Sequence, residues 1–342
     1  MAQTLCPGRA PARRAPAQLL VTEGGPMQHE RRSRGPGPGA SAGPQTGQAQ
    51  YPLPRATVAV LRQHSKQDAP FAGTNRSLAL NKLVGPWARL DAGQAELDPD
   101  TRRRFLQALC QEPKEAQEVR QLMLKRWQAQ VESYRRSGWT VCELRAQPEW
   151  RFVSGLGMAN PLETNLVLHR IGGFPYIPGS SIKGAVRAYA EFELLEQGVQ
   201  PRRPQARATE FSAQERDLLQ VFGAQDQAGK VIFFDALPVT GTTLELDVIN
   251  VHYPAYYQQG EPPADWLDPV PVPFLAVGKV TQFTFAVASR DARLAGLALR
   301  WLQGAVQTTG LGGKTSAGYG YFQPLPAPTQ RPQEHARGGR PR

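Results

Sequence analysis

The chain has 342 residues, a formal net charge of +11, and 40% hydrophobic residues. This length suits two average domains or one elaborated domain, and the positive charge suits a polyanionic partner. The three cysteines, Cys6, Cys110 and Cys142, lie far apart, without a C-x-x-C pair or clustered histidines. This spacing argues against a zinc site or a disulfide framework and favours a reducing compartment. No segment has the pattern of a signal peptide or a membrane span, so we expect a cytoplasmic protein with no metal and no cofactor.

The positive charge is concentrated at the two ends of the chain. Residues 1–50 supply +4 and residues 328–342 supply +3, which leaves +4 for the body. Charge alone is therefore weak evidence for nucleic-acid binding. Residues 1–50 are rich in Pro, Gly, Ala, Gln and Arg and carry almost no aromatic or β-branched side chains, so we predict a disordered leader. Residues 324–342 are expected to form a disordered basic tail.

Residues 51–138 are predicted to hold an N-terminal segment and a helical insertion. Asp98 followed by Pro99 is a typical N-cap and first helical position. The helical pattern breaks near Pro113 and resumes over residues 115–138. Arginines fall on the outside of this helix, so we expect an insertion or lid with solvated charged faces.

From Trp139 the apolar period changes towards two, which indicates strands. Strands are predicted at residues 141–145, 151–153, 165–170, 230–235, 243–251, 278–289 and 319–322. Helices are predicted at 180–198 and 291–308, a flexible loop at 200–209, and an irregular Pro-rich insertion at 253–273. Setting insertions aside, the order is strand, helix, strand, strand, helix, strand. We therefore predict an α+β fold with a ferredoxin-like or RRM-like core over residues 139–323, a four-stranded sheet with two helices on one face.

A helix-start motif, F-P-Y-I-P-G-S-S-I-K-G-A-V-R, occupies residues 174–187. Its prolines favour an extended approach, and Ser180 or Ser181 is expected to be the N-cap. Lys183 and Arg187 lie one helical turn apart on one exposed face. Amides, hydroxyls and two cations at a helix N-terminus suit an anion such as phosphate. A capped amphipathic helix with two solvated charges would have the same pattern.

A glycine-rich loop, G-L-G-G-K-T-S-A-G-Y-G, occupies residues 310–320. It is not a nucleotide-binding P-loop, because the first glycine of that motif would fall at Thr308 and because a helix precedes the loop where a strand is required. Glycines still let backbone amides approach a ligand, and successive amides can form an anion-binding nest. A flexible hairpin loop is the alternative. The predicted phosphate-contacting residues are Gly310, Gly312, Gly313, Lys314, Thr315, Ser316 and Gly318.

Together with G-L-G at residues 155–157 and P-x-E at residues 161–163, these two motifs resemble those of the RAMP superfamily of CRISPR–Cas proteins. The likeness is greatest to the family of sixth Cmr subunits of type III-B effector complexes. It covers about residues 75–322 and is strongest at 151–189 and 308–322. The leader at residues 1–50 departs from the family pattern.

The resemblance implies a non-catalytic, RNA-binding structural subunit of a crRNA-guided, RNA-targeting antiviral complex, which caps the end near the crRNA 3′ region. The implied partners are crRNA, target RNA as a further possibility, and the first, backbone and small helical Cmr subunits, with no membrane. The residues that would contact RNA are Ser180, Ser181, Lys183 and Arg187, together with the loop residues named above.

Two alternatives stay open. The first is a RAMP-type endoribonuclease acting on crRNA precursor or target RNA, with His252 or Asp247 as the acid or base, since L-D-V-I-N-V-H-Y at residues 246–253 resembles a stretch in the family. Asp247 and His252 fall on opposite faces of the predicted strand, which is poor geometry for one reaction centre. A structural or RNA-contacting role is therefore favoured for both. The second alternative is a protein–protein adaptor without RNA contact.

Overall fold

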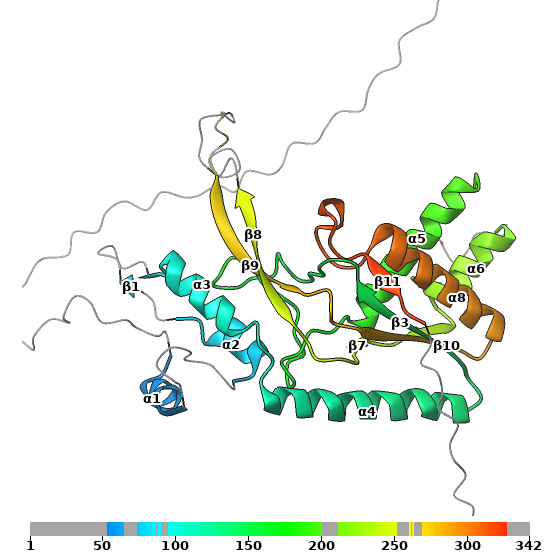
Figure 1. The fold of residues 1–342 in the computed structure, drawn as a ribbon. Helices are drawn as coiled ribbons and strands as arrows, with labels where there is room; N and C mark the ends of the chain where they lie inside the picture. Colours follow the sequence, from blue (N-terminus) through cyan, green and yellow to red (C-terminus); the bar gives the residue numbers. More distant parts are fainter. Residues whose placement is uncertain are drawn as a thin grey trace, which may run out of the picture. The chain divides into compact units, whose positions relative to one another are not determined.

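The computed structural model describes residues 53–64, 74–85, 88–89, 95–199, 211–251, 260, 262 and 269–326 (Figure 1). These residues belong to one unit that spans residues 47–342. Several sequence predictions lie outside the described residues: the leader at 1–50, the tail from 327, the loop at 200–209, His252, and most of the Pro-rich insertion.

The centre of the fold is an antiparallel sheet in the strand order β11-β3-β10-β6. Its strands are β3 (Thr140–Pro148), β6 (Val231–Phe233), β10 (Phe283–Ser289) and β11 (Phe322–Pro324), with β7 (Leu237–Pro238) also paired to β10. The strands predicted at 141–145, 230–235 and 278–289 are confirmed with altered bounds. The last strand starts three residues later than predicted, at Phe322.

Helices α5 (Gly179–Glu196) and α8 (Ala292–Gly304) pack on one face of this sheet. As predicted, Asp291 caps α8 by accepting from the amides of the first turn, and Phe283, Phe285 and Val287 of β10 are fully buried in the core on this side. A third helix beside them, α6 (Ala213–Phe222), was not predicted. Its start carries a capping box between Ser212 and Glu215, which was a readable signal in the sequence.

Helix α4 (Lys114–Arg136) covers the other face of the sheet, as Figure 1 shows. Trp127 and Val131 are buried there against the second row of β10 side chains, Ala286 and Ala288. The Trp127 indole also donates a 2.8 Å hydrogen bond to the carbonyl of Asp235. The predicted helical insertion is thus a layer of the core. The molecule is an α+β structure with helices on both faces of an antiparallel sheet.

A two-stranded ribbon of β8 (Leu244–Val251) and β9 (Val270–Val277) stands apart from this sheet. The prediction of irregular structure through residue 273 is therefore wrong from Val270 on. That prediction relied on the prolines of β9, yet these prolines are compatible with the hydrogen bonds between β8 and β9. Val277 exchanges both backbone hydrogen bonds with Phe152, on the side away from β8. Pro271 and Pro273 share this outward parity, so their missing N–H groups remove no bond to β8.

Two further strand predictions are wrong. Residues 151–153 and 165–170 contribute only isolated bridges, at Phe152 and at Leu168. The physical reason is that their backbone bonds go to separate partners. Phe152 pairs with the base of β9, whereas Val167 donates to the carbonyl of Ser154.

The remaining elements are short or lie before α4. Helix α3 begins after the predicted Asp98 N-cap, with Pro99 as its first residue. The bounds are α1 (Arg55–His64), α2 (Arg76–Lys82), β1 (Ala88–Arg89), β2 (Ala95–Glu96), α3 (Pro99–Ala108), β4 (Gly223–Ala224), β5 (Gln227–Ala228), η1 (Ala305–Thr309) and η2 (Thr315–Ala317).

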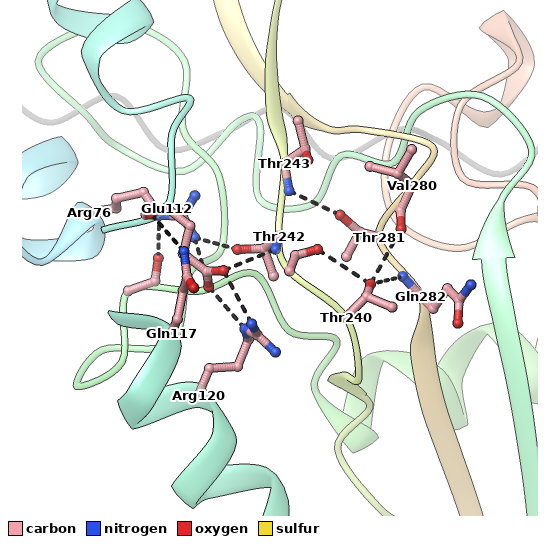
Figure 2. Close-up of polar contacts among 12 residues, drawn as sticks. Arg76, Glu112, Gln117, Arg120, Thr240, Thr242, Thr243, Val280, Thr281 and Gln282 are labelled. Atoms are coloured by element: carbon pink, nitrogen blue, oxygen red, sulfur yellow. Dashed lines mark hydrogen bonds and ion pairs between the residues drawn. The ribbon is translucent and has the colours of Figure 1, made fainter. Parts of the chain in front are cut away.

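A buried charge network ties this N-terminal part to the core (Figure 2). The Glu112 carboxylate accepts two hydrogen bonds from Arg120 and lies 3.6 Å from Arg76. Arg76 is 1% exposed and donates to the Thr242 hydroxyl at 2.6 Å and to the Gly173 carbonyl at 3.0 Å. Burial lowers the pKa of Arg76 to about 10, and Glu112 opposes that fall. The network links α2 and α4 to the segments that precede α5 and β8.

Candidate nucleic-acid interface

The glycine-rich loop at residues 310–320 is held closely against the segment that follows β3. The amide of Gly313 donates to the Val153 carbonyl, and the amide of Gly320 donates to the Arg151 carbonyl, both at 2.8 Å. The neck of the loop closes through the Leu311 amide and the Gly320 carbonyl, also at 2.8 Å. The loop is therefore an ordered turn with a fixed base, in place of the flexible hairpin that was the alternative.

Lys314 occupies the left-handed region, with φ +57°. For a residue with a Cβ this conformation costs about 1 kcal/mol or more, in a loop where glycine is otherwise the common residue. Its ammonium lies 5.8 Å from the ring centroids of both Phe274 and Tyr319, a cation–π arrangement. Within the described residues no carboxylate lies within ion-pair distance of Lys314. The loop thus presents a positioned cation that no described carboxylate pairs with.

A clamp of side chains joins the loop to the ribbon. The Tyr319 hydroxyl donates to the Asp247 carboxylate at 2.5 Å, and the Arg151 guanidinium contacts the same carboxylate oxygen at 2.5 Å. Arg151 also donates to Glu245 at 2.7 Å. Asp247 and Glu245 share one face of β8 by strand parity, and that face points to the loop.

The clamp shifts the pKa values of its members. Burial tends to raise the pKa of the Asp247 carboxyl, but hydrogen bonds from Tyr319 and the Val248 amide, with the Arg151 charge, hold that pKa below its ordinary value. Burial, followed by the Asp247 carboxylate, raises the pKa of Tyr319 to about 12. Asp247 is therefore a fully engaged carboxylate, which disfavours a role as general base near neutral pH.

The N-terminus of α5 differs from its prediction. The helix begins at Gly179 after Pro178, with no side-chain cap from either serine. Ser180 and Ser181 are exposed residues of the first turn. The amide of Gly179 instead donates to the Asp235 carboxylate at 2.7 Å. A residue 56 positions away thus satisfies the first free amide of the helix, and its charge suits the positive end of the helix dipole.

The two basic residues of α5 differ in their surroundings. Arg187 pairs with Glu191 one turn further along the helix, at 2.7 Å, with both side chains more than a third exposed. A surface pair of this kind contributes at most about 1 kcal/mol and can rearrange. Lys183 is half-buried, and among the described residues it has no ion-pair partner. Lys183 and Lys314 are thus the basic residues of the two motifs without an ion-pair partner in the described part of the chain.

Helix α5 also packs against η1, the five residues that lead into the glycine-rich loop. The ring of Tyr189 lies over Gly304, where an added Cβ would be 2.2 Å from the ring. The core therefore places α5 beside the segment that enters the loop, although no hydrogen bond or ion pair joins residues 179–187 to residues 310–320 within the described chain.

The two motifs and the segment between them fall within a single family match. A model described as the RAMP superfamily matches residues 151–323, just over half of the chain. The chain belongs to the RAMP superfamily. The match starts after β3, so it covers both motifs but not the first strand of the central sheet.

Two characterised proteins are similar to this RAMP chain. The first, the CRISPR system Cmr subunit Cmr6 of Pyrococcus furiosus, is 36% identical over 217 residues, which are 50% of this chain and 64% of that protein. The second, the Cmr6 subunit of Saccharolobus solfataricus, is 28% identical over 151 residues, 44% of each chain. The chain spans less than two thirds of the length of either relative.

Solved structures of similar chains have low overall superposition scores. A chain of the type III-B Cmr-beta complex bound to cognate target RNA has a TM-score of 0.47 at 20% identity, covering 62% of this chain and 71% of that one. The crystal structure of Cmr6 from Pyrococcus furiosus has a TM-score of 0.38 at 32% identity, covering 55% and 99%. A chain of a CRISPR RNA-guided surveillance complex has a TM-score of 0.33 at 19% identity, covering 54% and 66%.

In the described part of the chain, no group of three His, Cys, Asp or Glu side chains could hold a metal ion. None of the helices in the same residues is long and apolar enough to cross a membrane. The sheet face on which an RRM stacks bases is covered here by α4.

Sequence reasoning missed two residues beside the glycine-rich loop and one at the start of α5. Trp150, Arg151 and Asp235 were not candidates, yet the first two lie against Tyr319 and Asp247, and the third caps α5. One signal was available. Trp150 and Arg151 directly follow a strand and precede the G-L-G motif, a position where exposed residues often serve a site. The partners of Asp235 carried no local signal.

Proposed function

We propose that this chain is a non-catalytic, RNA-binding structural subunit of a crRNA-guided type III-B (Cmr) complex that targets RNA in antiviral defence. Its position would be the end of the complex near the crRNA 3′ region. Its partners would be crRNA, target RNA, and the first, backbone and small helical Cmr subunits, in the cytoplasm. The similarity to two Cmr6 subunits supports this assignment.

The core would be ferredoxin-like, as in RRM modules. The strand order β11-β3-β10-β6 supports this, because these are the fourth, first, third and second strands of a strand-helix-strand-strand-helix-strand unit. Helix α4 and the β8–β9 ribbon would be additions to that unit. Because α4 covers one sheet face, RNA would run past the loop edge of the core.

The observation that carries the RNA assignment is the ordered glycine-rich loop, with Lys314 in a left-handed conformation and no counter-charge among the described residues. A strained backbone residue persists where the surrounding structure compensates for it, often at a ligand site. Lys314 and Lys183 would contact phosphates, with Arg187 released from Glu191. The Gly312 amide and the hydroxyls of Ser180, Ser181, Thr315 and Ser316 would supply hydrogen bonds. Gly310, Gly313 and Gly318, whose amides donate to carbonyls within the fold, would shape the turn. Such contacts position RNA without reading its sequence.

The test is RNA binding by the full-length chain, measured by fluorescence anisotropy with a labelled single-stranded RNA over a salt series. Affinity is expected to fall steeply as salt rises, and Lys314→Gly and Lys183→Ala are expected to reduce that slope by about one each. Glycine at 314 keeps the left-handed backbone, so this variant removes only the side chain. Unchanged affinity in both variants would exclude the two lysines as RNA contacts, and a wild-type chain that binds no RNA would leave an adaptor role without RNA contact.

Assembly and catalysis need separate measurements. Affinity purification of the tagged chain from its host is expected to recover other Cmr subunits and a short crRNA. Labelled precursor and target RNAs are expected to stay intact with the purified chain, with or without divalent metal. Cleavage that His252→Ala or Asp247→Asn abolishes would instead establish an endoribonuclease.

A further inference from the structure

Trp150 is an exposed aromatic residue at the edge of the glycine-rich loop. Its side chain is 46% exposed, and Trp150 and Phe192 are the two aromatic members of the large exposed hydrophobic residues in the described chain. The backbone on both sides of Trp150 is fixed. The Glu149 amide donates to the Tyr321 carbonyl, and the Arg151 carbonyl accepts from the Gly320 amide. The ring is therefore held at the surface by the same bonds that anchor the loop.

Trp150 ends a row of three aromatic rings that starts in the ribbon. The Phe274 ring is 6.0 Å from that of Tyr319, and the Tyr319 ring is 4.8 Å from that of Trp150. Phe274 and Tyr319 are buried, whereas Trp150 is open to solvent. Two cations flank the row: Lys314 lies over the two buried rings, and Arg151 is 4.9 Å from the Trp150 centroid.

This combination is typical of surfaces that bind single-stranded nucleic acid. Such surfaces pair basic groups that follow the backbone with aromatic rings on which successive bases stack. The neighbouring Arg151 charge is already compensated by Asp247 and Glu245, so Arg151 braces the indole and leaves Lys314 as the cation for a phosphate.

We propose that Trp150 is a stacking position for one unpaired RNA base, adjacent to the phosphate contact at Lys314. This inference rests on the proposed RNA-binding function. It adds that the RNA is single-stranded where it meets Trp150. It also adds that Trp150 does not distinguish between bases, since every base has a face that can stack. A protein partner that packs on the indole is the competing occupant. Lys314, whose ammonium lies beside the two buried rings of the same row, favours RNA.

The experiment measures binding of the full-length chain to a labelled single-stranded RNA and to the same oligonucleotide with abasic sites. Trp150→Ala is expected to weaken binding to the normal RNA roughly tenfold, and Trp150→Phe, which keeps an aromatic face, by less. Binding to the abasic oligonucleotide is expected to be the same for wild type and both variants. Phe192→Ala, with 44% exposure on α5, is the matched control and is expected to bind as wild type.

The outcomes separate this inference from the proposed function. If Lys314→Gly weakens RNA binding but Trp150→Ala and Trp150→Phe do not, the chain binds RNA and stacking at Trp150 is wrong. If wild type prefers normal over abasic RNA and Trp150→Phe retains part of that preference, stacking is supported even should Trp150→Ala fold poorly. If Trp150→Ala loses Cmr subunits on purification while its RNA affinity is unchanged, the indole contacts protein. Wild type that binds no RNA overturns both proposals.

Discussion

The hydroxyl of Tyr319 donates a 2.5 Å hydrogen bond to the carboxylate of Asp247, which joins the glycine-rich loop to the β8–β9 ribbon across 72 residues of sequence. Because Asp247 also pairs with Arg151, one carboxylate fixes both the loop and the segment that carries Trp150. The orientation of the loop, and so of Lys314, depends on a residue for which the sequence favoured a structural or RNA-contacting role over that of an acid or base.

Tyr319→Phe is expected to lower the free energy of unfolding by about 1–2 kcal/mol, because the variant removes a hydrogen bond to a charged acceptor while Arg151 still pairs with Asp247. Urea unfolding followed by circular dichroism measures this. Tyr321→Phe is the matched control, two residues along the chain, whose backbone carbonyl makes the bond to Glu149. Equal losses in both variants would mean that the Tyr319–Asp247 bond contributes nothing of its own.

Gly320→Ala is expected to destabilise the protein by at least about 2 kcal/mol. Gly320 has φ +77°, and an added Cβ would lie 1.9 Å from the Leu311 carbonyl oxygen, which opens the neck of the loop. Two other loop positions are controls of graded severity. Gly318→Ala would incur only the left-handed strain, since nothing lies within 4 Å, and Gly313→Ala meets its nearest atom at 3.9 Å. Thermal melts are expected to rank the variants in that order, with Gly313→Ala closest to wild type.

Glu112→Ala is expected to cost about 3–5 kcal/mol, because it leaves Arg76 buried without its counter-charge. The Arg76 side chain is 1% exposed and that of Glu112 is 4% exposed, and both lie at the centre of the contacts in Figure 2. Glu118→Ala, an exposed position on α4, is expected to change stability by less than about 0.5 kcal/mol. A similar small change in Glu112→Ala would contradict the view that the network holds α2 and α4 to the core.

Stability is expected to fall between about pH 7.5 and pH 5.5 partly through His169. Burial lowers the pKa of His169, opposed by Asp235, and its Nδ1 accepts from the Gly172 amide at 3.0 Å. A lowered folded-state pKa means that the neutral form stabilises the fold fully above the unfolded pKa of about 6.5, and that this contribution is lost as pH falls further. Urea midpoints at both pH values are expected to fall less in His169→Gln than in wild type. If the urea midpoint fell equally in His169→Gln and wild type, His169 would not contribute to the loss of stability at low pH.

Local sequence signals predicted several elements well. Asp98 with Pro99 and Asp291 mark the starts of α3 and α8, because an N-cap and the amides it satisfies lie within three residues. The alternation in β10 predicted that Phe283, Phe285 and Val287 share one face, although all seven residues of the strand are buried because both sheet faces are covered. The capping box before α6 was equally local, yet no element was predicted between the loop at 200–209 and the strand at 230–235. The RAMP motifs could be recognised in the sequence because each lies in a continuous run of residues.

What decided the site was tertiary structure. Asp235 in place of a serine at the start of α5, Asp247 as the clamp on Tyr319, and α4 across the second sheet face all depend on partners between about fifty and more than a hundred residues apart. By itself, the sequence determined where helices start, which faces are apolar and which glycines can turn, since these follow from backbone geometry within a few residues. Which carboxylate satisfies which donor follows only when the packed core brings distant segments within hydrogen-bond range.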